Sequence, residues 1–110
     1  MLDAIGFAAS ISDCTAETEI EHTYAGYTFT ADEPAVRLAM DGLRRAGFEP
    51  SAGFSGGGAD ANVFNERGLS CVNLANGMAE IHTPDEHIAV ADLEAMVDVT
   101  IAIVAAAREA

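Results

Sequence analysis

Three consecutive glycines, Gly56 to Gly58, lie between an apolar segment and a short helical pattern that begins at Asp60. A strand, a glycine loop and a helix in this order bring backbone N–H groups and the positive end of a helix dipole to one point. Such a loop binds anions, or it is only a tight turn whose glycines adopt a positive φ. Both interpretations stay open. The chain contains no lysine, so a Walker phosphate loop is excluded.

Apolar residues recur at helical spacing in three segments, which we expect to form helices over residues 33–46, 60–66 and about 91–108. The first of these is amphipathic and ends at Gly47, a residue type that favours the end of a helix. Residues 1–13 show only a weak helical pattern. The last helix is expected to turn inward a stripe made of Leu93, Met96, Val97, Thr100, Ile101 and Val104.

Three other segments have the composition or the alternation of strands: residues 15–28, 48–54 and 69–74. The first carries glutamates on one side, which should face water. Residues 76–85 are expected to form a loop, and residues 87–90 a short extended piece. Strands that alternate with helices predict an α/β fold, with a mostly parallel sheet flanked by helices.

Charge and cysteine content exclude several classes of function. The 18 acidic and 5 basic residues give a formal net charge of −13, and such a surface repels nucleic acid. No apolar run approaches the roughly 20 residues that cross a membrane, so we expect no membrane contact. Cys14 and Cys71 form no Cys-x-x-Cys pair and no signal sequence is visible, which indicates a reducing, cytoplasmic setting.

A second polar loop holds His82, in the run Ile81-His82-Thr83-Pro84-Asp85-Glu86. A neutral imidazole in a loop that follows a buried strand is well placed to bind a metal at the rim of a sheet. Asp85 and Glu86 are candidate partners for the second ring nitrogen of such a histidine, or they are only solvated loop residues. A lone histidine does not decide between these interpretations.

The order of the glycine run, the segment Asn65-Glu66-Arg67-Gly68 and the histidine loop resembles the C-terminal end of peptidase T-like zinc peptidases. These belong to a clan with aminoacylase, carboxypeptidase G and succinyl-diaminopimelate desuccinylase. The resemblance implies that residues 1–27 are the end of a lid or dimerisation domain, including its last strand. Residues 28–110 would then be the C-terminal part of the catalytic domain.

The resemblance also implies roles for individual residues. Residues of the glycine loop would lie against the substrate: Gly56, Gly57, Gly58, Asp60 and Asn62. His82 would bind one ion of a co-catalytic zinc pair. The residues themselves leave other roles open, because Asp60 could cap its helix, Asn62 could be a solvated first-turn residue, and Arg67 could be an ordinary surface arginine. Relatives often carry serine or threonine where this chain has Ala59, which puts a side-chain contact at that position in doubt.

The rest of the family's metal site has no counterpart here. The chain contains no His-x-Asp triplet and no Glu-Glu pair, and we assign no catalytic residue. We therefore expect a C-terminal fragment of a zinc metallopeptidase that hydrolyses small peptides or N-acyl amino acids and is not competent alone. Its expected partners are the missing N-terminal half and further copies of itself, as a homo-oligomer. The alternative is a non-catalytic α/β module for binding or assembly.

Overall fold

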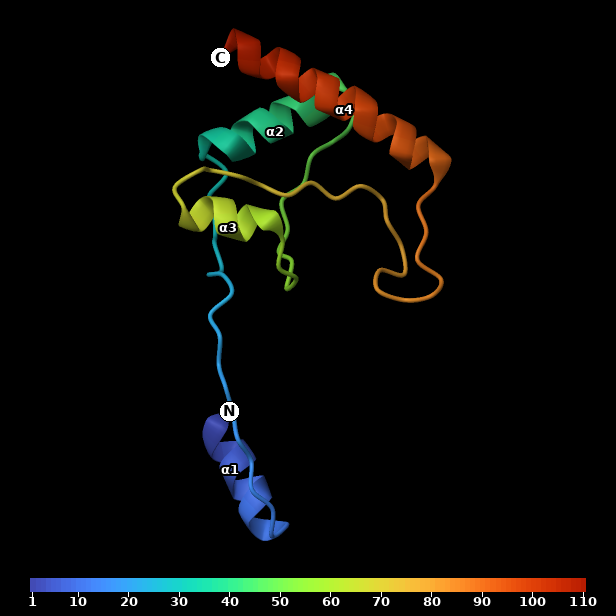
Figure 1. The fold of residues 1–110 in the computed structure, drawn as a ribbon. Coiled ribbons are helices and arrows are strands. Elements are labelled where there is room, and N and C mark those ends of the chain that lie inside the picture. The colour runs from blue at the N-terminus through green and yellow to red at the C-terminus, as the bar shows by residue number, and fades with distance from the viewer.

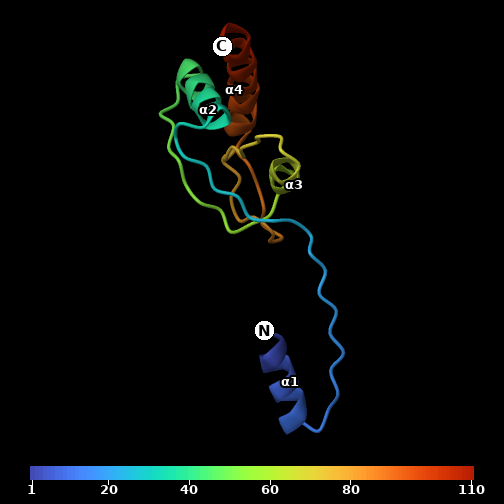
Figure 2. The same cartoon turned by 90° about the vertical axis from the view of Figure 1, so that its left-hand side faces the viewer.

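The computed structural model describes residues 1–110, which form four helices (Figure 1). They are α1 (Leu2–Ile11), α2 (Pro34–Arg45), α3 (Asp60–Glu66) and α4 (Val90–Glu109). Helices α2 and α4 lie side by side, and α3 lies below them (Figures 1 and 2). A long extended segment connects α1, at the far end of the molecule, to the other helices. The helices predicted from residues 33–46, 60–66 and 91–108 are confirmed to within one or two residues at each end.

The contact between α2 and α4 is the packed centre of the structure. Val99 of α4 is only 1% exposed. Gly42 of α2 allows the two helices to approach closely, because a Cβ atom there would lie 2.9 Å from the Cα atom of Ile103. At the end of α2, the Arg45 guanidinium binds Asp41 and, at 2.9 Å, Glu109 of α4. The hydrogen bond with Glu109 is the main reason that the pKa of Arg45 is raised, so this side chain stays charged.

The face of α4 that meets α2 is not the one that the sequence predicted. The residues of α4 that are buried or half-buried are Ala95, Met96, Val99, Ala102, Ile103 and Ala106. Of the predicted stripe only Met96 belongs to this set, while Val97 and Ile101 are 58% and 62% exposed. The prediction was wrong because α4 is apolar on nearly its whole circumference, so that periodicity cannot rank its two apolar faces. The second face stays uncovered.

The predicted parallel sheet is absent, and this part of the fold class was wrong. Residues 15–28, 48–54 and 69–74 form no strand, because none pairs with a neighbour, and the only bridge joins Ala79 to His87. A strand needs a partner to satisfy its N–H and C=O groups. At Cys71 a side chain takes the partner's place, because Asn65 accepts from the Cys71 N–H at 2.8 Å and donates to its C=O at 2.7 Å.

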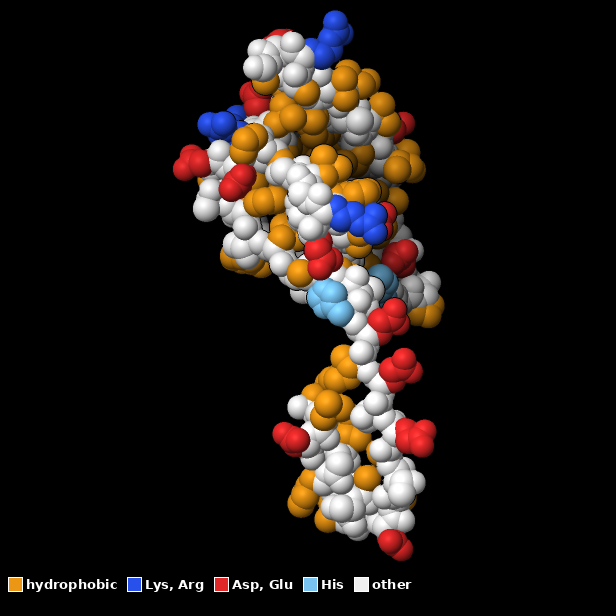
Figure 3. Space-filling model, turned by 60° about the vertical axis from the view of Figure 1, so that its left-hand side comes forward, with side chains coloured by type: hydrophobic (Ala, Val, Ile, Leu, Met, Phe, Trp, Pro, Cys, Tyr) orange, Lys and Arg blue, Asp and Glu red, His pale blue; other side chains and the backbone are white.

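Much apolar surface remains exposed. Only 6 of the 110 residues are buried. The radius of gyration is 19.8 Å, whereas a compact domain of this length has about 13 Å. Figure 3 shows apolar side chains over the end of the molecule that holds α2, α3 and α4, and along the lower part that holds α1. Acidic side chains lie on the segment between these two parts.

No helix combines the length and the apolar character that a membrane span requires.

Candidate functional site

Only one of the three glycines of the loop, Gly58, is required by a close contact, and none by backbone conformation. None of Gly56, Gly57 and Gly58 has a positive φ, so the interpretation of these residues as positive-φ turn glycines is wrong. Instead, a Cβ atom at Gly58 would collide with the ring of Tyr24. The N–H of Gly57 donates to Ser55 Oγ at 3.3 Å, whereas those of Gly56 and Gly58 have no partner within the chain. Two exposed backbone donors are therefore available to an anionic or carbonyl oxygen.

Asn62 is buried, at 8% exposure, so its interpretation as a solvated first-turn residue is wrong. Its Oδ1 accepts from the Ala59 N–H at 3.0 Å, and its Nδ2 donates to the Ala25 carbonyl at 3.0 Å. Both ends of the amide are thus engaged by backbone groups. The first of these bonds satisfies an N–H at the start of α3.

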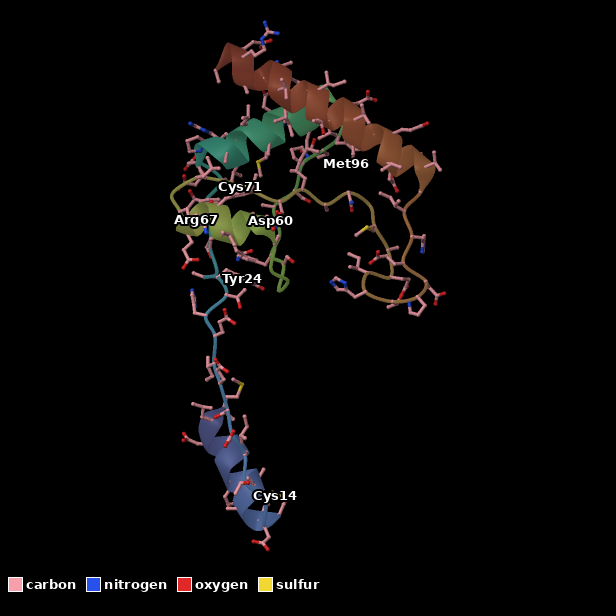
Figure 4. All side chains as sticks on the ribbon, in the orientation of Figure 1. Cys14, Tyr24, Asp60, Arg67, Cys71 and Met96 are labelled. Atoms are coloured by element: carbon pink, nitrogen blue, oxygen red, sulfur yellow. The ribbon has the colours of Figure 1, made fainter.

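Asp60 is exposed at the first turn of α3, next to Tyr24 in the view of Figure 4. Its carboxylate makes no hydrogen bond, and Ala59 occupies the N-cap position, so Asp60 does not cap the helix. A carboxylate here is favoured by the helix dipole alone. Arg67, at the other end of α3, forms no salt bridge and remains a surface arginine in this chain.

A small cavity of about 340 Å³ lies between the segment after Tyr24 and helix α3. Its lining includes Tyr27 and Phe29, whose rings lie 5.2 Å apart, and the polar side chains of Asn62, Asn65 and Glu66. The contacts that Tyr24, Ala25 and Asn65 make were not predicted from the sequence. Each involves a residue that is distant in the chain or depends on the path of the intervening loop.

The histidine loop is closed by its own backbone. Ala79 and His87 exchange two hydrogen bonds of 2.9 and 3.2 Å, which tie the two ends of the loop together. Within the loop, Thr83 Oγ1 donates to the Glu80 carbonyl at 2.7 Å, and the ring of His87 contacts the Asp85 carbonyl through Nδ1 at 2.7 Å. The expected loop over residues 76–85 is therefore confirmed.

His82 adopts a left-handed backbone conformation with φ +67°, which is uncommon for residues other than glycine. Its N–H donates to Oε2 of Glu86 at 2.9 Å. Glu86 thus holds the backbone of His82 and not its ring, while the carboxylate of Asp85 makes no hydrogen bond. The imidazole of His82 has no hydrogen-bond partner within the chain.

The glycine loop and the histidine loop both extend away from α2 and α4 on the side where α3 lies (Figures 1 and 2). No three His, Cys, Asp or Glu side chains gather closely enough to hold a metal ion. Protein zinc sites use three or four side-chain ligands. Residues 1–110 therefore hold no complete set of zinc ligands.

Known proteins resemble the chain along most of its length. The family model described as peptidase family M20/M25/M40 matches residues 3–106. The uncharacterized protein YqjE of Bacillus subtilis is 35% identical over 89 residues, which are 81% of this chain and 24% of that protein. A succinyl-diaminopimelate desuccinylase of Xanthomonas campestris is 41% identical over 69 residues, or 62% of this chain and 18% of the enzyme.

A solved structure shows the same fold. Aminopeptidase PepT of Bacillus cereus superposes with a TM-score of 0.73 and 35% identity, over 93% of this chain and 27% of PepT. The chain thus spans about a quarter of the length of YqjE and PepT. Together with the match over residues 3–106, these similarities show that the chain belongs to peptidase family M20/M25/M40.

Proposed function

We propose that residues 1–110 form the C-terminal part of a zinc-dependent amidohydrolase that cleaves small peptides or N-acyl amino acids. One observation carries the proposal. The backbone of His82 is fixed by Glu86, while its imidazole is left without a partner, on a loop that extends to the same side of the molecule as the glycine run (Figure 1). Neither ring nitrogen of His82 is engaged within the chain, so either one is free to bind a metal ion.

The relatives support this class of reaction. PepT is named an aminopeptidase, and the relatives in Xylella and Xanthomonas are named succinyl-diaminopimelate desuccinylases. The first name describes a peptidase, and the second the removal of a succinyl group. The chain spans only 18–27% of these relatives, so we propose that the remaining zinc ligands and the general base come from a further segment of polypeptide.

Each loop has a role in this proposal. A zinc ion, one of a pair in the complete enzyme, would polarise the scissile carbonyl and lower the pKa of bound water. His82 would bind one of these ions. The free N–H groups of Gly56 and Gly58 would bind a carboxylate or carbonyl oxygen of the substrate, near Asp60 and the start of α3. Asn62 would hold this loop in place and would not contact the substrate, since both ends of its amide are already engaged by backbone groups.

The experiment has two arms. The purified chain is assayed with zinc, manganese or cobalt against dipeptides, tripeptides and N-acyl amino acids, and we expect no turnover. The chain is then co-expressed with PepT from which the matched 27% has been removed. We expect a complex that contains zinc and hydrolyses peptides. Turnover that scales with the chain alone, or a zinc-loaded complex that hydrolyses none of these substrates, contradicts the proposal.

A further inference from the structure

The segment before Gly26 touches the glycine loop and α3 at three places. The ring of Tyr24 lies so close to Gly58 that a Cβ atom added at that position would displace the ring. The carbonyl of Ala25 accepts from Asn62 Nδ2 at 3.0 Å. His22 Nε2 lies 3.2 Å from Oε1 of Glu66. Residues that are between 34 and 44 positions apart are therefore held together here without any sheet or helix pairing.

The amide of Asn62 is the centre of this contact. It bridges the Ala25 carbonyl on one side and the Ala59 N–H on the other, both at 3.0 Å. Asn62 is also the one buried polar residue of the chain. A buried amide that loses a partner is left unsatisfied, which disfavours any movement of one backbone segment without the other. Because the amide group is planar and rigid, a shift of Ala25 is passed on to Ala59.

We propose that Asn62 is a positioning residue that couples residues 1–27 to the glycine loop. Tyr24 is the second element of this coupling, since its ring fills the space that Gly58 leaves. When the segment before Gly26 moves, the start of α3 and the N–H groups of the glycine loop move with it. The consequence for substrate binding rests on the proposed function. The coupling itself rests only on the contacts of Tyr24, Ala25 and Asn62.

The first test reads the coupling without any catalytic activity, by site-resolved NMR of the 110-residue chain. We expect the Ala59 N–H to exchange with solvent at least ~10-fold more slowly than a free amide, because it is hydrogen-bonded. Asn62→Ala should abolish this protection. Asn62→Asp keeps the acceptor for Ala59 and loses the donor to Ala25, so it should retain the protection and shift the Gly26 amide resonance. The peptide plane of Gly26 contains the Ala25 carbonyl.

Asn65→Ala is the matched control. Asn65 also uses both ends of its amide, but on the backbone of Cys71, so this variant should leave the signals of Ala59 and Gly26 unchanged. An unprotected Ala59 in the native chain, or equal effects of the Asn62 and Asn65 variants, overturns the proposal.

A pair of compensating substitutions tests the contact between Tyr24 and Gly58. Gly58→Ala should disturb both NMR signals, because the added Cβ meets the Tyr24 ring. Tyr24→Ala in the same chain should restore them, because it removes the ring. A general loss of structure would not be reversed in this way. If Gly58→Ala has the same effect with and without the tyrosine ring, the coupling through Tyr24 is wrong.

In the complex with the remainder of PepT, Asn62→Asp should raise KM about tenfold, with a smaller effect on kcat and an unchanged zinc content. An unchanged KM contradicts the transmission to the glycine loop. The NMR signals separate the two proposals. If they behave as expected and no complex hydrolyses peptides, the proposed function fails and the coupling stands. If the NMR signals do not behave as expected, the proposed coupling fails, whether or not a complex hydrolyses peptides.

Discussion

Glu86 holds the backbone of His82 through a 2.9 Å hydrogen bond from the His82 N–H to Oε2. The bond fixes a left-handed conformation, with φ +67°, that a residue with a side chain adopts at a cost of about 1–3 kcal/mol. A neighbour that stabilises such a conformation determines the direction in which the imidazole leaves the loop. In this chain, the carboxylate four residues later therefore orients a candidate metal ligand without touching its ring.

This relationship predicts the effect of Glu86→Ala on metal binding. The loop should lose the left-handed conformation at His82, and zinc affinity in the complex with the remainder of PepT should fall by roughly 10–100-fold, as for other groups that orient a ligand. Asp85→Ala is the control, because the Asp85 carboxylate makes no hydrogen bond. Zinc titration measures both variants. If Glu86→Ala and Asp85→Ala lower zinc affinity equally, negative charge near the loop determines zinc affinity, and the hydrogen bond to His82 does not.

The close approach of α2 and α4 at Gly42 gives a prediction about stability. Gly42→Ala adds a Cβ that lies within 3.0 Å of backbone atoms of Ile103. Overpacking of this kind costs about 1–3 kcal/mol, while the better helix propensity of alanine returns at most about 1 kcal/mol. We therefore expect a net loss of stability, visible as an earlier loss of helical circular dichroism on urea titration.

Gly6→Ala in α1 is the matched control for this substitution. A Cβ at Gly6 meets nothing within 4 Å, so only the gain in helix propensity of about 0.5–1 kcal/mol remains. Its helical signal should persist to higher urea concentration. A stabilising effect of both substitutions would show that α2 and α4 do not pack as described.

The sequence predicted the helices well, because their signals are local. Gly47 has φ +90° just after α2, and apolar spacing marks α2 and α3 without reference to the rest of the chain. The predicted strands at residues 15–28, 48–54 and 69–74 have the right composition but lack partners, and pairing is not a local property. For the same reason the two apolar faces of α4 could not be ranked.

The candidate site was predicted in part. His82 and the glycine run stood out by residue type, but their metal and substrate roles stay predictions. The contacts of Asn62 with Ala25 and of Tyr24 with Gly58 could not be predicted from local sequence patterns, because they join residues 34 or more positions apart. The bond from Glu86 to the His82 backbone depends on a loop conformation that no periodic pattern encodes.

The uncovered face of α4 predicts self-association of the isolated chain. Val97 and Ile101 are 58% and 62% exposed, one helical turn apart, and lie on the side that does not meet α2. Contiguous apolar surface of this kind drives association. Light scattering after size-exclusion chromatography should show oligomers at high concentration. The double variant Val97→Gln, Ile101→Gln should shift the chain toward the monomer.

Glu94→Gln is the control on the same helix, because it introduces the same side chain at a polar, exposed position. It should leave the oligomers intact. A compact, monodisperse monomer formed by the unaltered chain at high concentration would show that the exposed face of α4 needs no partner.

The zinc content of the complex between this chain and the remainder of PepT tests the central claim most directly. Three complexes are compared by metal analysis: the unaltered chain, His82→Ala and His87→Ala. His87 belongs to the same loop and has its Nδ1 against the Asp85 carbonyl, with Nε2 free. The account assigns the metal to His82, so the loss of His87 should leave the zinc content unchanged. His82→Ala should remove one ion and lower zinc affinity by more than the ~100-fold expected for an orienting group. A complex that keeps its zinc without His82 and loses it without His87 would contradict the account.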